Sequence, residues 1–175
     1  NLLVGKEQNK IMSESLENFT NIVKEDIKEA KTLFFSEAFK EEYLKDRREE
    51  KELYHQLLLG RNRNQILEEF LLSSGQKKPV LLSAAKTIYQ ATIMNLDEPL
   101  EIKVKREGWG YLVGGIKSDG TFLSLHKNTF QAEDFEDGTL TIYADMKTIP
   151  KDGDIDHLII QTVYQTLQIE VVYKE

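Results

Sequence analysis

The chain has 175 residues, of which 40% are apolar, so it is long enough for one or two small domains with a hydrophobic core. Its net charge of −7 argues against a nucleic-acid binder, which needs clustered Lys and Arg to displace phosphate counterions. The sequence has no cysteine, which excludes disulfides, thiolate metal sites and a cysteine nucleophile.

The composition bears only weakly on the cellular compartment of the protein. The absence of cysteine fits a reducing compartment and slightly favours the cytoplasm, although many exported bacterial domains also lack cysteine. No apolar run approaches the roughly 18 residues of a membrane span, so we expect no membrane insertion. The chain opens on Asn1 rather than Met, and we interpret it as part of a longer protein.

The hydrophobic pattern changes its period near Pro79. Before this residue, apolar side chains recur at helical spacing among dense charges; after it, they alternate as in strands. The change predicts an α+β protein with segregated halves: a helical segment over residues 1–78, of which 1–15 form an arm or linker, and a β-sandwich over 79–175. The first half holds 14 basic and 15 acidic residues and the second 9 and 15, so the net charges are −1 and −6.

Four short amphipathic helices are predicted before Pro79. Each combines apolar residues at 3-4 spacing with a polar residue that can cap its first turn. In chain order they are a helix over 19–34 capped by Thr20 or Asn21, a helix capped by the hydroxyl of Ser36, Glu49–Leu59, and about Gln65–Leu72 capped by Asn62 or Asn64.

The second half predicts about seven short antiparallel strands separated by Gly and Asp turns, which is typical of an immunoglobulin-like sandwich. No helix of crossover length lies between them, which excludes a parallel α/β fold, while a small barrel stays open. The expected strands are Val80–Ser83, Thr87–Met94, Leu100–Arg106, Trp109–Ile116, a strand around 122–125, Leu140–Ala144, His157–Thr162 and Thr166–Tyr173. A helical turn is expected at Gln131–Phe135.

Four aromatic and basic residues are candidates for ligand binding. Trp109 and Tyr111 could form a stacking platform for sugar rings or peptides, although a Trp at the start of a central strand ordinarily packs between the sheets. Arg61 and Arg63 could bind an anion near the start of the fourth helix, where the helix dipole would help. Their alternative role is to cap helix carbonyls or to pair with nearby acids.

Three aspartates alternate along one turn, at Asp152, Asp154 and Asp156. Carboxylates at this spacing can gather Ca²⁺, but Gly153 does not fit the pattern of an EF-hand loop, and a plain acidic turn is favoured. The three histidines lie in separate elements without metal-binding spacing, and no nucleophile–base pair stands out. We therefore expect no catalytic residue, no cofactor and no bound metal.

A series of packing and turn motifs follows in order along residues 19–175. The motifs are Phe19-Thr20, the Glu25-Asp26 helix, Phe34-Phe35-Ser36, Glu69-Phe70-Leu71, Lys77-Lys78-Pro79, Gly108-Trp109-Gly110-Tyr111, Glu133-Asp134-Phe135 and the run from Gln161 to Thr166. In this order they resemble a family of very long, uncharacterised bacterial proteins. The resemblance implies an immunoglobulin-like module, a short helical segment and a second immunoglobulin-like module, and it carries no catalytic residue. One departure is the acidic turn over 151–157, which is basic and Gly-rich in that family, so an anion site is not expected there.

The function that these observations favour is a non-catalytic structural or protein-interaction region of a larger multidomain bacterial protein. Its expected partners are other proteins or other domains of the same chain, and neither nucleic acid nor membrane. The alternative is a surface module on the sandwich that binds carbohydrate or calcium. The structure can distinguish these two functions, because the ligand-binding module needs exposed aromatic rings or converging carboxylates.

Overall fold

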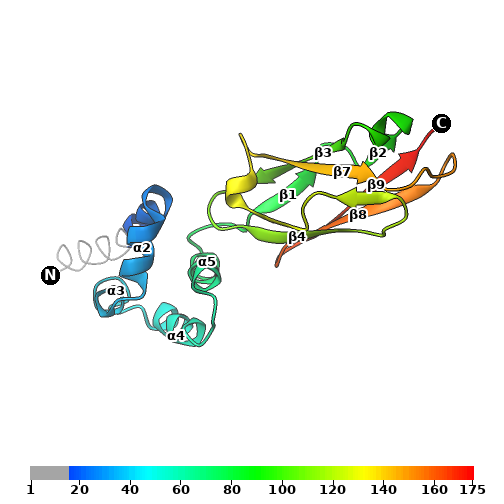
Figure 1. Ribbon diagram of the computed structural model, residues 1–175. Helices are drawn as coiled ribbons and strands as arrows, with labels where there is room; N and C mark the ends of the chain where they lie inside the picture. The colour runs from blue at the N-terminus through cyan, green and yellow to red at the C-terminus, as the bar shows by residue number, and fades with distance from the viewer. Residues whose placement is uncertain (1–15) are drawn as a thin grey trace. The chain divides into compact units, whose positions relative to one another are not determined.

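The computed structural model describes residues 16–175; the arm or linker expected over residues 1–15 lies outside this part (Figure 1). The chain forms two compact units. One extends to Pro79 and includes Trp109–Tyr111, and the other consists of Val80–Gly108 and Leu112–Glu175. The first unit is helical and the second is a sandwich of two sheets, so the fold class is the one that the sequence predicts.

Short helices make up the first unit, and the first of the predicted helices is interrupted. Asp26 has extended backbone, and its carboxylate accepts a hydrogen bond from the Glu29 N–H (3.1 Å), so a new helix begins there. The expected cap at Thr20 or Asn21 is wrong, because residues 16–25 are already helical. The helices that follow are α2 (Ile27–Phe34), α3 (Glu37–Glu42), α4 (Arg48–Leu57) and α5 (Arg63–Ser73).

Two further caps can be compared with the sequence. Asn62 caps α5 as expected, its side-chain oxygen accepting a hydrogen bond from the Gln65 N–H (3.2 Å). Ser36 stands at the cap of α3, but its hydroxyl donates backward to the Leu33 carbonyl (2.6 Å) and accepts no helix N–H. The helical core is aromatic, with the ring centroid of Phe34 5.0 Å from those of Phe39 and Tyr54.

The second unit packs two sheets face to face (Figure 1). One sheet has the strand order β1-β3-β7-β5 and the other β2-β9-β8-β4-β6. The strands are β1 (Leu81–Ala84), β2 (Ile88–Ala91), β3 (Leu100–Glu107), β4 (Val113–Ser118), β5 (Leu123–Leu125), β6 (Thr129–Gln131), β7 (Thr139–Met146), β8 (Ile155–Gln161) and β9 (Thr166–Tyr173). The 3₁₀ turns η1 (Ile93–Leu96) and η2 (Ala132–Asp134) lie between them.

The central strand orders are those of the immunoglobulin fold. The series β1-β3-β7 reproduces its A-B-E order and β9-β8-β4 its G-F-C order. All pairs are antiparallel except β2 with β9, which run parallel in the register Ile88↔Glu170 to Ala91↔Tyr173. Inward-facing residues alternate along each strand, and Ile102, Ile142 and Leu158 are among those buried between the sheets.

Candidate functional site

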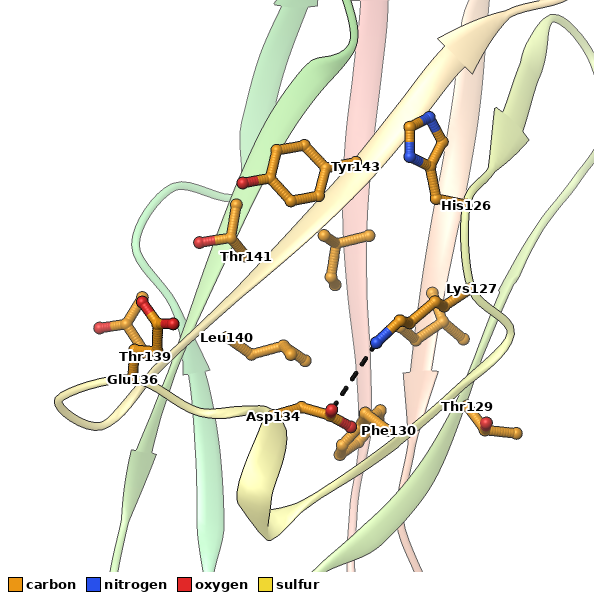
Figure 2. A pocket seen from close by; sticks show the side chains of 12 residues that line it. His126, Lys127, Thr129, Phe130, Asp134, Glu136, Thr139, Leu140, Thr141 and Tyr143 are labelled. Atoms are coloured by element: carbon orange, nitrogen blue, oxygen red, sulfur yellow. Dashed lines mark ion pairs between the residues drawn. The ribbon is translucent and has the colours of Figure 1, made fainter.

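A pocket opens on the edge of the sandwich, with a volume of about 310 Å³. Figure 2 shows β7 along one side and the segment from His126 to Thr129 along the other. Buried apolar side chains line its depth, and polar side chains line its mouth. The buried residues are Ile116, Phe130, Leu140 and Ile142; the polar ones are His126, Lys127, Thr129, Asp134, Glu136, Thr139, Thr141 and Tyr143.

The pocket exists because β5 is short. β5 pairs with β7 only from Ala144 to Met146, and the chain then leaves this sheet to form β6 in the other. The remaining part of β7, from Thr139 to Tyr143, has its β3 neighbour on one side and borders the pocket on the other. An edge of a sheet is thereby left open beside an apolar floor.

Gly114 of β4 shapes the floor. A Cβ atom at this position would lie 2.3 Å from Phe130 Cζ and 2.5 Å from the Gln161 carbonyl oxygen, which is too close for any real contact. The missing side chain lets the Phe130 ring reach its buried position on β6. The neighbouring Gly115 is different, since a Cβ there would meet only the Asn128 carbonyl oxygen, at an ordinary 3.6 Å.

We predict that Gly114→Ala destabilises the sandwich by about 1–3 kcal/mol, because the added methyl group forces Phe130 or β8 to move. Gly115→Ala is the matched control and should leave the free energy of unfolding nearly unchanged. Urea denaturation of both variants measures the difference. Equal stability of the two variants would contradict this account of the pocket floor.

The polar mouth carries mixed charges, and two of its side chains already contact charged partners. His126 Nε2 lies 2.9 Å from Asp145 Oδ2, and the ring stacks on Tyr143 with centroids 5.9 Å apart. Lys127 Nζ lies 3.7 Å from Asp134 Oδ1, the pair that Figure 2 marks. His126 and Lys127 are exposed, so a ligand can rearrange these two side chains at little cost.

The aromatic pair singled out in the sequence belongs to the helical unit. The expected place of Trp109 between the sheets is wrong: β4 begins only at Val113, and the half-buried indole packs with the helical core. Lys24 and Lys77 place their ammonium groups 4.9 and 4.4 Å from the centroid of its ring. Two cations therefore already occupy the ring that a sugar or peptide would stack on.

Tyr111 and the two arginines do not converge on one site. The Tyr111 hydroxyl lies 3.5 Å from the Asn62 side-chain amide. The Arg63 guanidinium lies over the Phe35 ring, 4.7 Å from its centroid, and Arg61 is exposed in the preceding turn. Arg63 thus has an aromatic partner, a role that the sequence did not suggest.

The three aspartates of the acidic turn have three different roles. The half-buried Asp154 accepts a hydrogen bond from the Lys151 N–H (3.0 Å), and the exposed Asp152 accepts one from the Glu175 N–H (3.1 Å). Asp156 is fully buried and turns into the sandwich. Within residues 16–175, no three His, Asp or Glu side chains lie in a group that could hold a metal ion.

Asp156 holds the β4–β5 connection from inside. One carboxylate oxygen accepts from the Asp119 N–H (3.2 Å), and the other from the N–H groups of Phe122 and Leu123 (3.0 Å each). Buried carboxylates are stable only when hydrogen-bonded in this way. Sequence reasoning missed this role, because an Asp in a strand after an acidic turn gives no sign of pointing inward.

His157 holds the same connection from outside, its Nδ1 lying 2.6 Å from Asp119 Oδ2. This hydrogen bond raises the pKa of His157 above its usual 6.5; the charges of Asp119, Glu170 and Asp156 act in the same direction, and desolvation opposes them. A raised pKa means that the folded state binds the proton more tightly than the unfolded state does. The stabilisation is complete below the unfolded pKa and is lost as the pH rises through the folded one.

We expect the melting temperature of the wild type to exceed that of His157→Gln at about pH 6 and the difference to shrink by about pH 8. Differential scanning calorimetry at both pH values measures it. His55→Gln, on helix α4, controls for the general effect of removing a histidine. A difference that does not change with pH would show that the His157–Asp119 contact is not ionic.

In the part of the chain from residue 16 onward, none of the helices has the length and apolar character needed to span a lipid bilayer.

Comparison with known proteins gives a family and distant structural similarities. A family described as "Family of unknown function (DUF5717) N-terminal" matches residues 4–175. No curated protein matches the sequence.

Three solved structures illustrate the structural similarity. The apo-form Calx CBD1 domain has a TM-score of 0.38 at 11% identity, covering 56% of this chain and all of that one. Domains 4 and 5 of the S-layer protein SbsC give 0.36 at 11% identity, covering 54% of this chain and 51% of that one. The E. coli chaperone DraB gives 0.38 at 6% identity, covering 54% of each chain. TM-scores and sequence identities this low do not support any inference about function.

Proposed function

This chain belongs to the N-terminal DUF5717 family of unknown function, and from that premise we propose that it is a non-catalytic region of a larger multidomain bacterial protein that binds another polypeptide. The observation that carries the proposal is the pocket beside the open edge of β7, which combines an apolar floor with a polar mouth. An open sheet edge offers backbone groups that only another polypeptide matches in spacing. The partner is either a separate protein or another domain of the same chain.

The side chains around the pocket support a binding role rather than a catalytic one. His126 and Asp145 form a hydrogen-bonded pair that could serve as a base and its orienting acid. Such a pair also needs a nucleophile, and within residues 16–175 no hydroxyl group hydrogen-bonds to the His126 ring. The nearest aromatic neighbour, Tyr143, stacks on the ring instead.

The alternative is a surface module that binds carbohydrate or calcium. Calcium binding is weakened by the position of Asp156, whose carboxylate is buried and engaged with three backbone N–H groups. Carbohydrate stacking on Trp109 is weakened by the two lysines that lie over its ring. The alternative therefore has no observation in its favour that equals the open edge of β7.

Site-specific photocrosslinking in cells that make the parent protein tests the proposal. Benzoylphenylalanine replaces Tyr143 at the pocket mouth or, as a control, Lys117 on the exposed face of the other sheet. The expected result is a discrete polypeptide adduct at Tyr143, absent at Lys117, in which mass spectrometry maps the crosslink to one segment of a protein. Absence of an adduct at both positions would contradict a polypeptide-binding role for this pocket.

A further inference from the structure

The backbone that hydrogen-bonds to the outer edge of β7 is interrupted by a gap of defined length. At one end, the His126 N–H donates to the Tyr143 carbonyl (3.0 Å). At the other end, Glu136 and Thr139 exchange two backbone hydrogen bonds of 2.9 Å. Between these two anchors, β7 faces the pocket through three residues, Leu140, Thr141 and Ile142. Three residues of extended chain, about 10 Å long, would fill the gap.

The backbone of Thr141 faces this gap. The Arg106 N–H donates to the Gly138 carbonyl, which fixes the even-numbered residues of β7 as those that hydrogen-bond to β3. The odd-numbered residues therefore direct their N–H and C=O groups to the other edge, as the Tyr143 carbonyl does toward His126. An added antiparallel strand could form a hydrogen-bonded pair with Thr141.

The alternation of side chains determines what such a segment must carry. A residue opposite Thr141 shares its face and points out of the sandwich, while the residues on either side of it point inward. The inward positions reach the apolar floor of Ile116, Phe130, Leu140 and Ile142. An apolar cavity of about 150 Å³ holds a benzene-sized group. The volume of about 310 Å³ thus has room for two aliphatic side chains.

The charges around the pocket mouth determine at which end of the segment a basic residue is favoured. An antiparallel segment would begin near His126 and end near Glu136, whose carboxylate is exposed at the mouth. Lys127 is balanced by Asp134 at 3.7 Å, and at the His126 end the Asp145 carboxylate already contacts the imidazole ring at 2.9 Å. Among the residues that line the mouth, Glu136 is therefore the carboxylate left to attract a basic residue. A basic residue directly after the segment would therefore be favoured over one directly before it.

We propose that the pocket binds an exposed extended segment of a protein partner, three residues long and antiparallel to β7, with aliphatic residues at its first and third positions and a Lys or Arg directly after it. This inference rests on the proposed function and specifies the partner's chemistry. The segment pairs with β7 between His126 and Glu136 through main-chain hydrogen bonds to Thr141. Its two aliphatic side chains fill the apolar part of the pocket.

A peptide titration tests the inference on the whole 175-residue chain. The probe is acetyl-Gly-Ser-Val-Thr-Val-Lys-Ser-Gly-amide, added to nitrogen-15-labelled protein and followed by the amide resonances of Thr141 and Tyr143. We expect both resonances to shift in a saturable way. N-methylation of the central Thr should weaken binding at least fivefold, because it removes the N–H that donates to the Thr141 carbonyl. N-methylation of the first Val should be tolerated, since its N–H points away from β7.

Two protein variants test the charge contribution. Glu136→Lys should weaken binding of this peptide and strengthen binding of one in which Lys precedes the first Val. Glu133→Lys, an equal charge change at an exposed residue outside the pocket, should leave this preference unchanged. No shift at Thr141 with millimolar peptide, or equal binding of both N-methylated peptides, would overturn the inference.

The two proposals fail in different ways. A polypeptide adduct at Tyr143 combined with no peptide binding leaves the proposed function standing and overturns the antiparallel segment. Absence of both the adduct and the peptide binding overturns both. A titration in which only Ca²⁺ or a sugar shifts the pocket resonances would instead favour the ligand-binding alternative and overturn both proposals.

Discussion

Replacing Lys77 with methionine should destabilise the helical unit by about 3–5 kcal/mol, because it would leave Glu68 with a buried charge that has lost its ion-pair partner. Lys77 Nζ lies 2.6 Å from Glu68 Oε1, and the two side chains are 0% and 3% exposed. The same ammonium group donates to the Trp109 carbonyl (2.6 Å). Gly110 permits this approach, since a Cβ there would lie 2.9 Å from Lys77 Nζ.

Urea denaturation followed by the circular dichroism of the helices measures this effect. Lys78→Met is the matched control, because it removes the neighbouring, exposed lysine. The double variant Glu68→Leu, Lys77→Met should recover much of the lost stability, since it removes both charges together. If Lys77→Met and Lys78→Met lost equal stability, the ion pair would have no stabilising role in the helical unit.

Asp156→Asn should destabilise the sandwich by about 1–3 kcal/mol. An asparagine presents one acceptor oxygen where the aspartate presents two, and its NH₂ group would face backbone donors. The amide takes the orientation that keeps its oxygen on the Phe122 and Leu123 N–H groups. The Asp119 N–H then loses its acceptor and faces the NH₂ group, at a cost of about 1–3 kcal/mol. The three N–H groups concerned belong to Asp119, Phe122 and Leu123.

Asp154→Asn makes the same chemical change two residues earlier, where the half-buried carboxylate accepts a single N–H, that of Lys151. Asp154→Asn should lower the free energy of unfolding by less than about 1 kcal/mol. Guanidinium denaturation of both variants gives the comparison. If Asp156→Asn were no worse than Asp154→Asn, the buried carboxylate would not be what holds the β4–β5 connection.

The periodicity of the sequence predicts the architecture well, because burial on one face is a local property of helices and strands. The alternation around Ile102 and Val104 identifies β3, and Asn62 identifies the start of α5. The break at Asp26 was missed because the apolar spacing continues across it: Phe19 and Phe34 enter one core from two helices. The parallel pairing of β2 was also missed, since pairing direction leaves no periodic signal.

The candidate site could not be predicted, because it depends on which strands pair and where the pairing stops. His126, Lys127 and Thr141 have no unusual spacing in the sequence, and they meet only because β5 ends after three residues. Gly114 was the one available signal, since a glycine inside a strand often marks a close approach of another group. The residues that did attract attention, Trp109 and Asp156, owe their conspicuous chemistry to structural roles.

The parallel pairing of β2 with β9 has a mechanical consequence. Tension applied between Val80 and Tyr173 would pull these two strands along their length in opposite directions, so their hydrogen bonds would bear the load together instead of breaking one after another. Gln165 would share the load, because its side-chain amide accepts from the Leu82 N–H (2.8 Å) and donates to the Leu82 carbonyl (2.7 Å). The sandwich is thus arranged to resist stretching along the chain direction.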